Sequence, residues 1–139
     1  MAEDTLMKTL SISAAGMQAQ GTRLRVIAEN IANANSLATQ PGALPYRRQV
    51  VTFSNELNRA LGIDTVQVSE VRHDLSDFGQ SFDPTHPAAD ENGYVLTPNV
   101  NSLIEMMDMR EAQRSYEANL NVMRNAKSML MSTIDMLRN

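Results

Sequence analysis

The stretch that decides the fold is residues 102–138, SLIEMMDMREAQRSYEANLNVMRNAKSMLMSTIDMLR. It contains neither glycine nor proline, and its apolar residues recur at alternating spacings of three and four. This spacing is typical of a coiled-coil seam, and it is sustained over about four heptads. Ser102 and Glu105 have the spacing of a capping box, which marks a helix start. We therefore predict one long helix whose assembly seam is formed by Met106, Met109, Tyr116, Leu120, Met123, Leu130, Ile134 and Leu137, with Gln113 and Lys127 as polar interruptions.

The N-terminal segment has the same periodicity and is the second predicted helix. Gly16 and Gly21 each cost about 1 kcal/mol relative to alanine inside a helix. Small residues there also allow a neighbouring helix to approach closely. The run NIANANS at residues 30–36 is rich in residues that favour helix ends, so we expect the helix to stop near Asn35. The predicted seam on this helix consists of Leu6, Leu10, Ser13, Met17, Gln20, Leu24, Ile27, Ile31 and Ala34.

Turn-forming and aromatic residues concentrate in the middle of the chain, residues 37–98. All five prolines lie there, as do five of the six phenylalanines and tyrosines. Runs of β-branched residues predict short strands at 46–53, 65–71 and 93–96. Residues 55–61 are compatible with a helical turn. Three short strands form a small lobe at best.

These patterns together predict a mainly α fold. We expect an N-terminal amphipathic helix in residues 1–36, a small irregular or β lobe in 37–98, and a C-terminal amphipathic helix in 99–139. The two helices are expected to pair as a coiled coil. Such a pair leaves a second apolar stripe uncovered, and this stripe suggests lateral packing against further subunits. Its members are Met7, Ile12, Leu103, Met107 and Met129.

Composition excludes several classes of function. The net charge is −4, which argues against a nucleic-acid binder because such domains are usually basic. There is no cysteine, so disulfides and thiol catalysis are excluded. His73 and His86 are the only histidines, and their spacing does not place two metal ligands on one helix face. We expect no metal, no cofactor and no catalytic residue, and we interpret the histidines as solvated loop residues.

The two chain ends carry no signal for membrane insertion. The N-terminal segment, MAEDTLMKTL, lacks the basic start and apolar core of a cleavable signal peptide. No segment approaches the roughly 18 consecutive apolar residues that a membrane span needs. If the protein leaves the cytoplasm, we expect it to use another route.

Several blocks resemble the flagellar rod and hook proteins, the axial proteins of the bacterial flagellum. Residues 12–35, ISAAGMQAQGTRLRVIAENIANAN, resemble the N-terminal signature of this family. The blocks PYRR at 45–48, DPTHP at 83–87 and PNVN at 98–101 resemble a subunit of the proximal rod in particular. Motif residues carried over by the resemblance are Asn30, Asn33, Asn35, Pro45, Tyr46, Arg47, Arg48, Asn99, Asn101, Tyr116 and Asn119.

The resemblance implies a structural subunit that self-assembles into the drive shaft crossing the periplasm. It also implies export by the flagellar type III apparatus without a cleaved signal. Implied partners are copies of itself and the other rod proteins FlgB, FlgF, FlgG and FliE.

Three alternatives remain open. One is another axial protein, either FlgB-like or from the distal rod. The second is a soluble cytoplasmic coiled-coil adaptor or export chaperone. The third is an enzyme that uses the acidic loop around His86.

Overall fold

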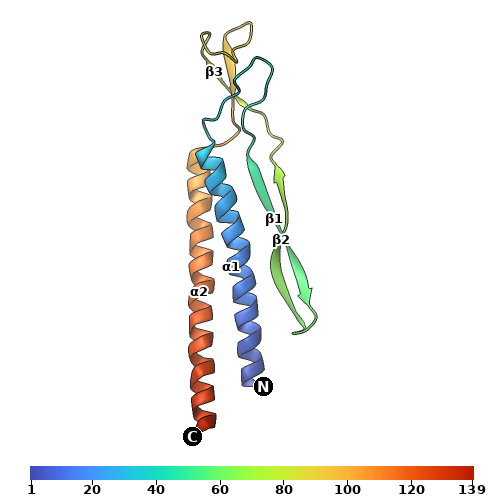
Figure 1. Cartoon of the computed structure of the whole chain (residues 1–139), viewed down its shortest axis with the longest axis vertical. Coiled ribbons are helices and arrows are strands. Elements are labelled where there is room, and N and C mark those ends of the chain that lie inside the picture. Colours follow the sequence, from blue (N-terminus) through green and yellow to red (C-terminus); the bar gives the residue numbers. More distant parts are fainter. The chain divides into compact units, whose positions relative to one another are not determined.

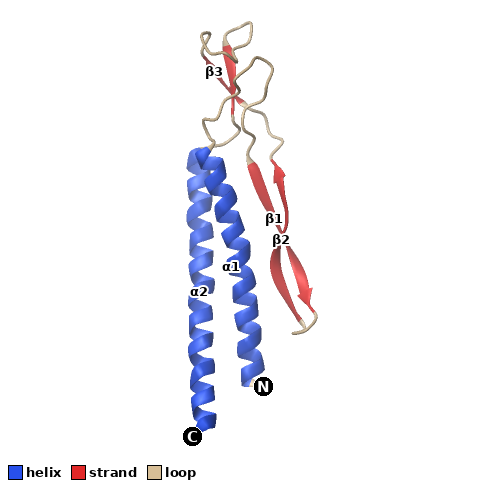
Figure 2. Ribbon diagram, viewed as in Figure 1, coloured by secondary structure: helices blue, strands red, loops and turns tan.

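The computed structural model describes all residues, 1–139. Along the sequence, one helix comes before the four strands and a second helix follows them (Figures 1 and 2). Neither helix combines the length and hydrophobicity that crossing a membrane would require. The elements are α1 (Ala2–Ala32), β1 (Gln49–Asn58), β2 (Ile63–His73), β3 (Gly79–Phe82), β4 (Tyr94–Thr97) and α2 (Ser102–Arg138).

The prediction of a mainly α coiled-coil pair is wrong. Helices make up 49% of the chain and strands 21%, and the strands form two small sheets. The prediction of a lobe of short strands underestimated the lengths of β1 and β2, which have 10 and 11 residues. The error has a physical cause, since strand pairing joins residues far apart in sequence and local periodicity does not report it.

The β1–β2 hairpin replaces the helical turn predicted for residues 55–61. The hydroxyl of Ser69 donates to the carbonyl of Thr52 (3.0 Å), and that of Thr65 donates to the carbonyl of Glu56 (3.3 Å). From Ser69 to Thr65 the residue numbers on β2 fall, while those of their partners on β1 rise from Thr52 to Glu56. The two strands therefore run antiparallel. The connecting turn closes through Gly62, whose φ of 66° suits glycine.

The chain divides into two compact units, each described here by itself. The first unit consists of Met1–Leu24, Thr52–Glu70 and Arg110–Asn139. The second consists of Arg25–Val51 and Val71–Met109. Each terminal helix therefore contributes residues to both units.

In the first unit, α1 lies between α2 on one side and the β1–β2 hairpin on the other (Figure 1). Small residues make the contact between the helices. A Cβ atom at Gly16 would lie 2.7 Å from the Nδ2 atom of Asn119. Ala112 and Ala126 on α2 are buried. Close approach through small residues, with the hairpin on the other side of α1, explains why the predicted coiled-coil pair does not form.

In the second unit, β3 and β4 form an antiparallel pair with Phe82 opposite Tyr94. Their rings meet edge to face, with centroids 5.4 Å apart. Val95 is buried, whereas Phe82 and Tyr94 remain exposed. The other face of this small sheet therefore displays an aromatic pair to solvent.

The start of α2 differs from the predicted capping box. The side-chain oxygen of Asn101 accepts hydrogen bonds from the backbone N–H groups of Leu103 (3.1 Å) and Ile104 (3.4 Å). Asn101 is thus the N-cap residue, a role that suits asparagine. Glu105, predicted to complete the box, is 1% exposed and its carboxylate is used elsewhere.

Candidate functional site

A buried polar cluster in the second unit joins several of the motif residues. Asn30 on α1 is 1% exposed. Its Nδ2 donates to the carbonyl of Gln49 (2.9 Å) and to Oε2 of Glu105 (3.3 Å). Its Oδ1 accepts from the Tyr46 hydroxyl (2.7 Å) and from the backbone N–H of Gln49 (2.9 Å). Both ends of this amide are satisfied, so Asn30 fixes the start of β1 against the helix.

Arg48 is the cationic centre of the same cluster. Its Nε donates to Oε1 of Glu105. Its two terminal nitrogens lie 3.2 Å from Asp74 Oδ2 and 3.7 Å from Asp108 Oδ2. One guanidinium therefore lies within ion-pair distance of three carboxylates, which its five N–H donors allow. The cluster holds β1, the segment after β2 and the first turns of α2 together.

Asn99 closes the cluster on its loop side. Its Oδ1 accepts from the backbone N–H of Arg48 (2.7 Å), and its Nδ2 donates to the carbonyls of Asp74 (3.0 Å) and Ser76 (3.2 Å). Arg47 donates to the same two carbonyls and lies over the Phe78 ring, 4.2 Å from its centroid. These side chains thus provide hydrogen bonds to the backbone carbonyls of Asp74 and Ser76, which lie in a loop and not in a strand.

The cluster changes the titration of its members. Hydrogen bonds from Ser76, followed by the charge and hydrogen bond of Arg48, hold the pKa of Asp74 below its usual value. Burial opposes the charge on Arg48, but its bonds to Glu105 and Asp74 outweigh burial and raise its pKa. Burial, followed by the charges of Glu29 and Glu105, raises the pKa of Tyr46.

Tyr46 provides a pH-dependent prediction. A raised pKa means that the tyrosine contributes stability that is fully present below pH 10.0 and is lost as pH rises through the folded-state pKa. At neutral pH, we expect Tyr46→Phe to lower the free energy of unfolding by about 1 kcal/mol, because the hydrogen bond to Asn30 is missing. As the pH rises above 10, the free energy of unfolding should fall less in Tyr46→Phe than in the wild type. Urea unfolding at pH 7 to 11 measures both effects. Tyr116→Phe is the control, and an identical alkaline loss in wild type and Tyr46→Phe would contradict the prediction.

The remaining motif residues have separate, local positions. Asn33 donates to the carbonyl of Glu29 (2.9 Å) and accepts from the hydroxyl of Ser36 (3.0 Å). Pro45 is buried and Asn35 is exposed. Asn119 donates to the carbonyl of Ser115 (3.0 Å). The structure therefore brings together Asn30, Tyr46, Arg47, Arg48 and Asn99, but not the others.

The predicted seam residues differ between the two helices. On α1, Ile27 is buried, and Leu6, Leu10, Met17, Leu24 and Ile31 are half-buried. On α2, Met109, Tyr116, Leu120, Met123 and Leu130 are half-buried, whereas Met106, Ile134 and Leu137 are exposed. The fully buried residues of α2 are instead Glu105, Ala112 and Ala126, each one position before a predicted seam residue. Sequence reasoning missed Ala112 and Ala126 because it counted large apolar residues, and it assigned Glu105 to a capping box.

The contact at Gly16 gives a second prediction. Gly21 has no neighbouring atom within 4 Å of an added Cβ, so Gly21→Ala should stabilise the chain by about 1 kcal/mol through helix propensity. Gly16→Ala should gain nothing or destabilise, because the Asn119 side chain must move. Thermal unfolding compares the two variants. Equal stabilisation by both would show that the close contact does not exist.

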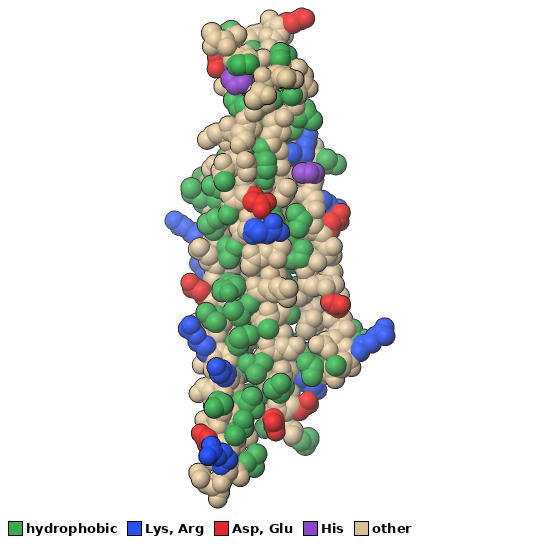
Figure 3. Space-filling view, in the orientation of Figure 1, with side chains coloured by type: hydrophobic (Ala, Val, Ile, Leu, Met, Phe, Trp, Pro, Cys, Tyr) green, Lys and Arg blue, Asp and Glu red, His purple; other side chains and the backbone are tan.

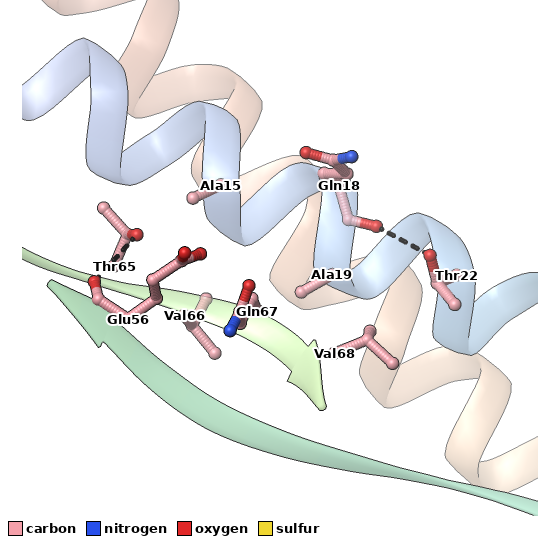
Figure 4. A pocket seen from close by; sticks show the side chains of 9 residues that line it. All are labelled: Ala15, Gln18, Ala19, Thr22, Glu56, Thr65, Val66, Gln67 and Val68. Atoms are coloured by element: carbon pink, nitrogen blue, oxygen red, sulfur yellow. Dashed lines mark hydrogen bonds between the residues drawn. The ribbon is translucent and has the colours of Figure 1, made fainter. Parts of the chain in front are cut away.

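The hairpin and α1 enclose a hollow of about 290 Å³ in the first unit (Figure 4). Ala15, Gln18, Ala19 and Thr22 line it from α1, facing Glu56, Thr65, Val66, Gln67 and Val68 from the hairpin. Glu56 is the only charged residue in its lining. The hollow contains no pair of groups arranged for proton transfer or nucleophilic attack.

Neither histidine side chain bonds to the polar cluster around Arg48. His73 ends β2 and is exposed. The Nδ1 atom of His86 accepts a hydrogen bond from the backbone N–H of Ala88 (3.0 Å), which makes it part of a turn. No group of three His, Asp or Glu side chains is arranged to hold a metal ion.

Comparison with known proteins extends over nearly the whole chain. The family described as flagellar basal body rod FlgEFG protein C-terminal matches residues 91–136. A flagellar basal-body rod protein FlgC from Agrobacterium fabrum is 51% identical over 135 residues, covering 97% of each chain. The protein of that name from Bacillus subtilis is 38% identical, covering 94% of this chain and 97% of its own. That from Salmonella typhimurium is 36% identical, covering 93% and 96%.

Proposed function

The chain belongs to the family of the flagellar basal-body rod protein FlgC and is a structural subunit of the rod, and from this premise we propose that it builds the proximal rod by self-assembly through its terminal helices. The observation that carries this proposal is the number of large apolar side chains left exposed on α2. Figure 3 shows hydrophobic side chains among charged ones along the visible face of the helices. Those exposed on α2 are Leu103, Ile104, Met106, Met107, Val122, Met129, Met131, Ile134, Met136 and Leu137.

These residues gather towards the two ends of α2, at 103–107 and at 129–137, with Val122 between the two groups. Contiguous exposed apolar surface on a protein marks an interaction site, whereas single exposed apolar residues are ordinary. Half of these ten residues are methionines, which adapt to irregular neighbouring surfaces. Neighbouring subunits that cover these two groups in the same way, through a contact that does not close, would generate a helical tube.

A groove at the ends of the two helices supports the same proposal. It has a volume of about 480 Å³ and lies between the first turns of α1 and the last third of α2. Its lining is Ala2, Thr5 and Leu6 from α1, with Ser128, Met129, Ser132 and Thr133 from α2. Small and apolar side chains there leave room for a side chain of an adjoining subunit.

We further propose the partners and the route. The neighbours are copies of this chain and the rod proteins FlgB, FlgF, FlgG and FliE. The subunit reaches the rod through the flagellar type III export apparatus, without a cleaved signal peptide. It acts mechanically, without catalysis.

A deletion strain tests this function. Cells that lack the chain should have no completed rod and should not swim, and the wild-type chain supplied in trans should restore both. Electron microscopy of isolated basal bodies reads out the rod. Normal rods in the deletion strain would reject the proposal.

A further inference from the structure

A third pocket lies beside the β3–β4 sheet, away from the helix surfaces discussed above. Its volume is about 210 Å³. Pockets for drug-sized ligands are usually about 300–1,000 Å³, so this one is sized for a single side chain. It is lined by Ala38, Gly42, Ala43, Ala88, Asp90, Tyr94 and Leu96.

The chemistry of this lining is specific. Aliphatic side chains and the Tyr94 ring make most of the wall apolar, and Asp90 is the only charged residue in it. An apolar wall with one carboxylate suits a side chain that has a long apolar stem and a positively charged head. Arginine and lysine are the two side chains of that form.

Asp90 is held in place by the backbone. Its Oδ1 accepts hydrogen bonds from the N–H groups of Asn92 (2.9 Å) and Tyr94 (2.9 Å). Its own N–H donates to the carbonyl of Tyr94 (2.9 Å). Only Oδ1 is used in this way, so the second carboxylate oxygen remains for an incoming donor. The pocket is therefore ordered before any partner arrives, and binding does not have to fix the loop.

The surrounding charge favours a cation. Residues 74–109 contain seven Asp and Glu residues and no Lys or Arg. Arg48 pairs with Asp74, Glu105 and Asp108, but it forms no ion pair with the other acidic residues of this segment. Those acidic residues, which have no ion pair within their own unit, are Asp77, Asp83, Asp90 and Glu91.

We propose that this pocket binds an arginine or lysine side chain presented by a neighbouring protein subunit of the rod. The stem lies against the alanines and Leu96, and the head meets Asp90. That the neighbour is a rod subunit rests on the proposed function, whereas the preference for a cationic side chain rests on the pocket alone.

A titration of the full-length chain tests the preference. The probe is N-acetylarginine amide, added to isotopically labelled protein while amide signals are followed by NMR. The matched control is N-acetylcitrulline amide, which has nearly the same shape and no charge. We expect the arginine probe to shift the signals of Ala38, Ala43, Ala88 and Leu96, and the citrulline probe to bind about fivefold more weakly. Equal shifts with both probes, or none with arginine, would overturn the proposal.

Two variants identify the carboxylate responsible. Asp90→Asn keeps the oxygen that accepts from Asn92 and Tyr94 but removes the charge, so arginine should bind it no better than citrulline. Glu91→Gln removes a neighbouring charge that does not line the pocket, and should change arginine binding less than twofold. Full arginine binding by Asp90→Asn would also overturn the proposal. Because the titration needs no rod, a negative result leaves the assignment of the chain to the rod intact.

Discussion

Replacing Arg48 with methionine is expected to destabilise the chain by about 4 kcal/mol. The substitution leaves Glu105, which is 1% exposed, without its cation. Removing one partner of a buried ion pair typically costs about 3–5 kcal/mol, because the other charge stays buried and uncompensated. That is a large share of the roughly 5–15 kcal/mol by which a domain is stable. Urea unfolding followed by circular dichroism measures the loss.

Two further variants show that the cause is the charge and not the shape. Arg48→Met combined with Glu105→Leu should recover most of the loss, since the fully buried carboxylate is removed together with its cation, whereas Asp74 and Asp108 remain partly exposed to solvent. Arg47→Met should cost less, about 1–2 kcal/mol, because Arg47 bonds to carbonyl groups and lies on a ring without neutralising a carboxylate. A double variant as unstable as Arg48→Met would contradict this account of the cluster.

The second large effect is on assembly. Met129→Asp combined with Met136→Asp is expected to abolish swimming and rod assembly while leaving stability within about 0.5 kcal/mol. Both side chains are exposed, at 59% and 78%, so neither charge enters the interior of the subunit. In an assembled rod, the proposed interface would bury two unpaired carboxylates, which is strongly unfavourable. Motility in soft agar and electron microscopy of basal bodies measure the outcome.

Matched charges at polar positions are the control. Asn121→Asp with Asn125→Asp alters two exposed residues of the same helix that lie outside the predicted seam, adding the same charge. This variant should assemble and swim. Normal motility of the Met129→Asp, Met136→Asp chain would contradict a role for the exposed methionines in assembly.

Sequence periodicity predicted both helices well because helix formation is governed by neighbours a few residues apart. The C-terminal segment contains no helix breaker between Ser102 and Arg138, and the structure places α2 there. The N-terminal helix was expected to end near Asn35, and it ends at Ala32. The hairpin was underestimated because pairing between Thr52 and Ser69 depends on residues far apart in sequence.

The polar cluster was only partly predictable. Asn30, Tyr46, Arg48 and Asn99 were identified by resemblance, which gave no physical role for them. Glu105 was read as a helix cap because its spacing from Ser102 fits one, yet its carboxylate bonds to Arg48 and Asn30. The one signal in the sequence was that Glu105 is the only acidic residue in the first turn of α2. Which acid meets which arginine depends on four separate segments meeting in space.

The central claim is that this chain is a structural subunit of the flagellar rod. The most direct test is to locate the chain in fractionated cells. Basal bodies purified from flagellated cells, after removal of the cytoplasm and membranes, are analysed by quantitative mass spectrometry. We predict that the chain is recovered with the rod and is missing from basal bodies of an export-deficient strain. Recovery only in the cytoplasmic fraction of flagellated cells, as a compact monomer or small closed oligomer, would contradict it.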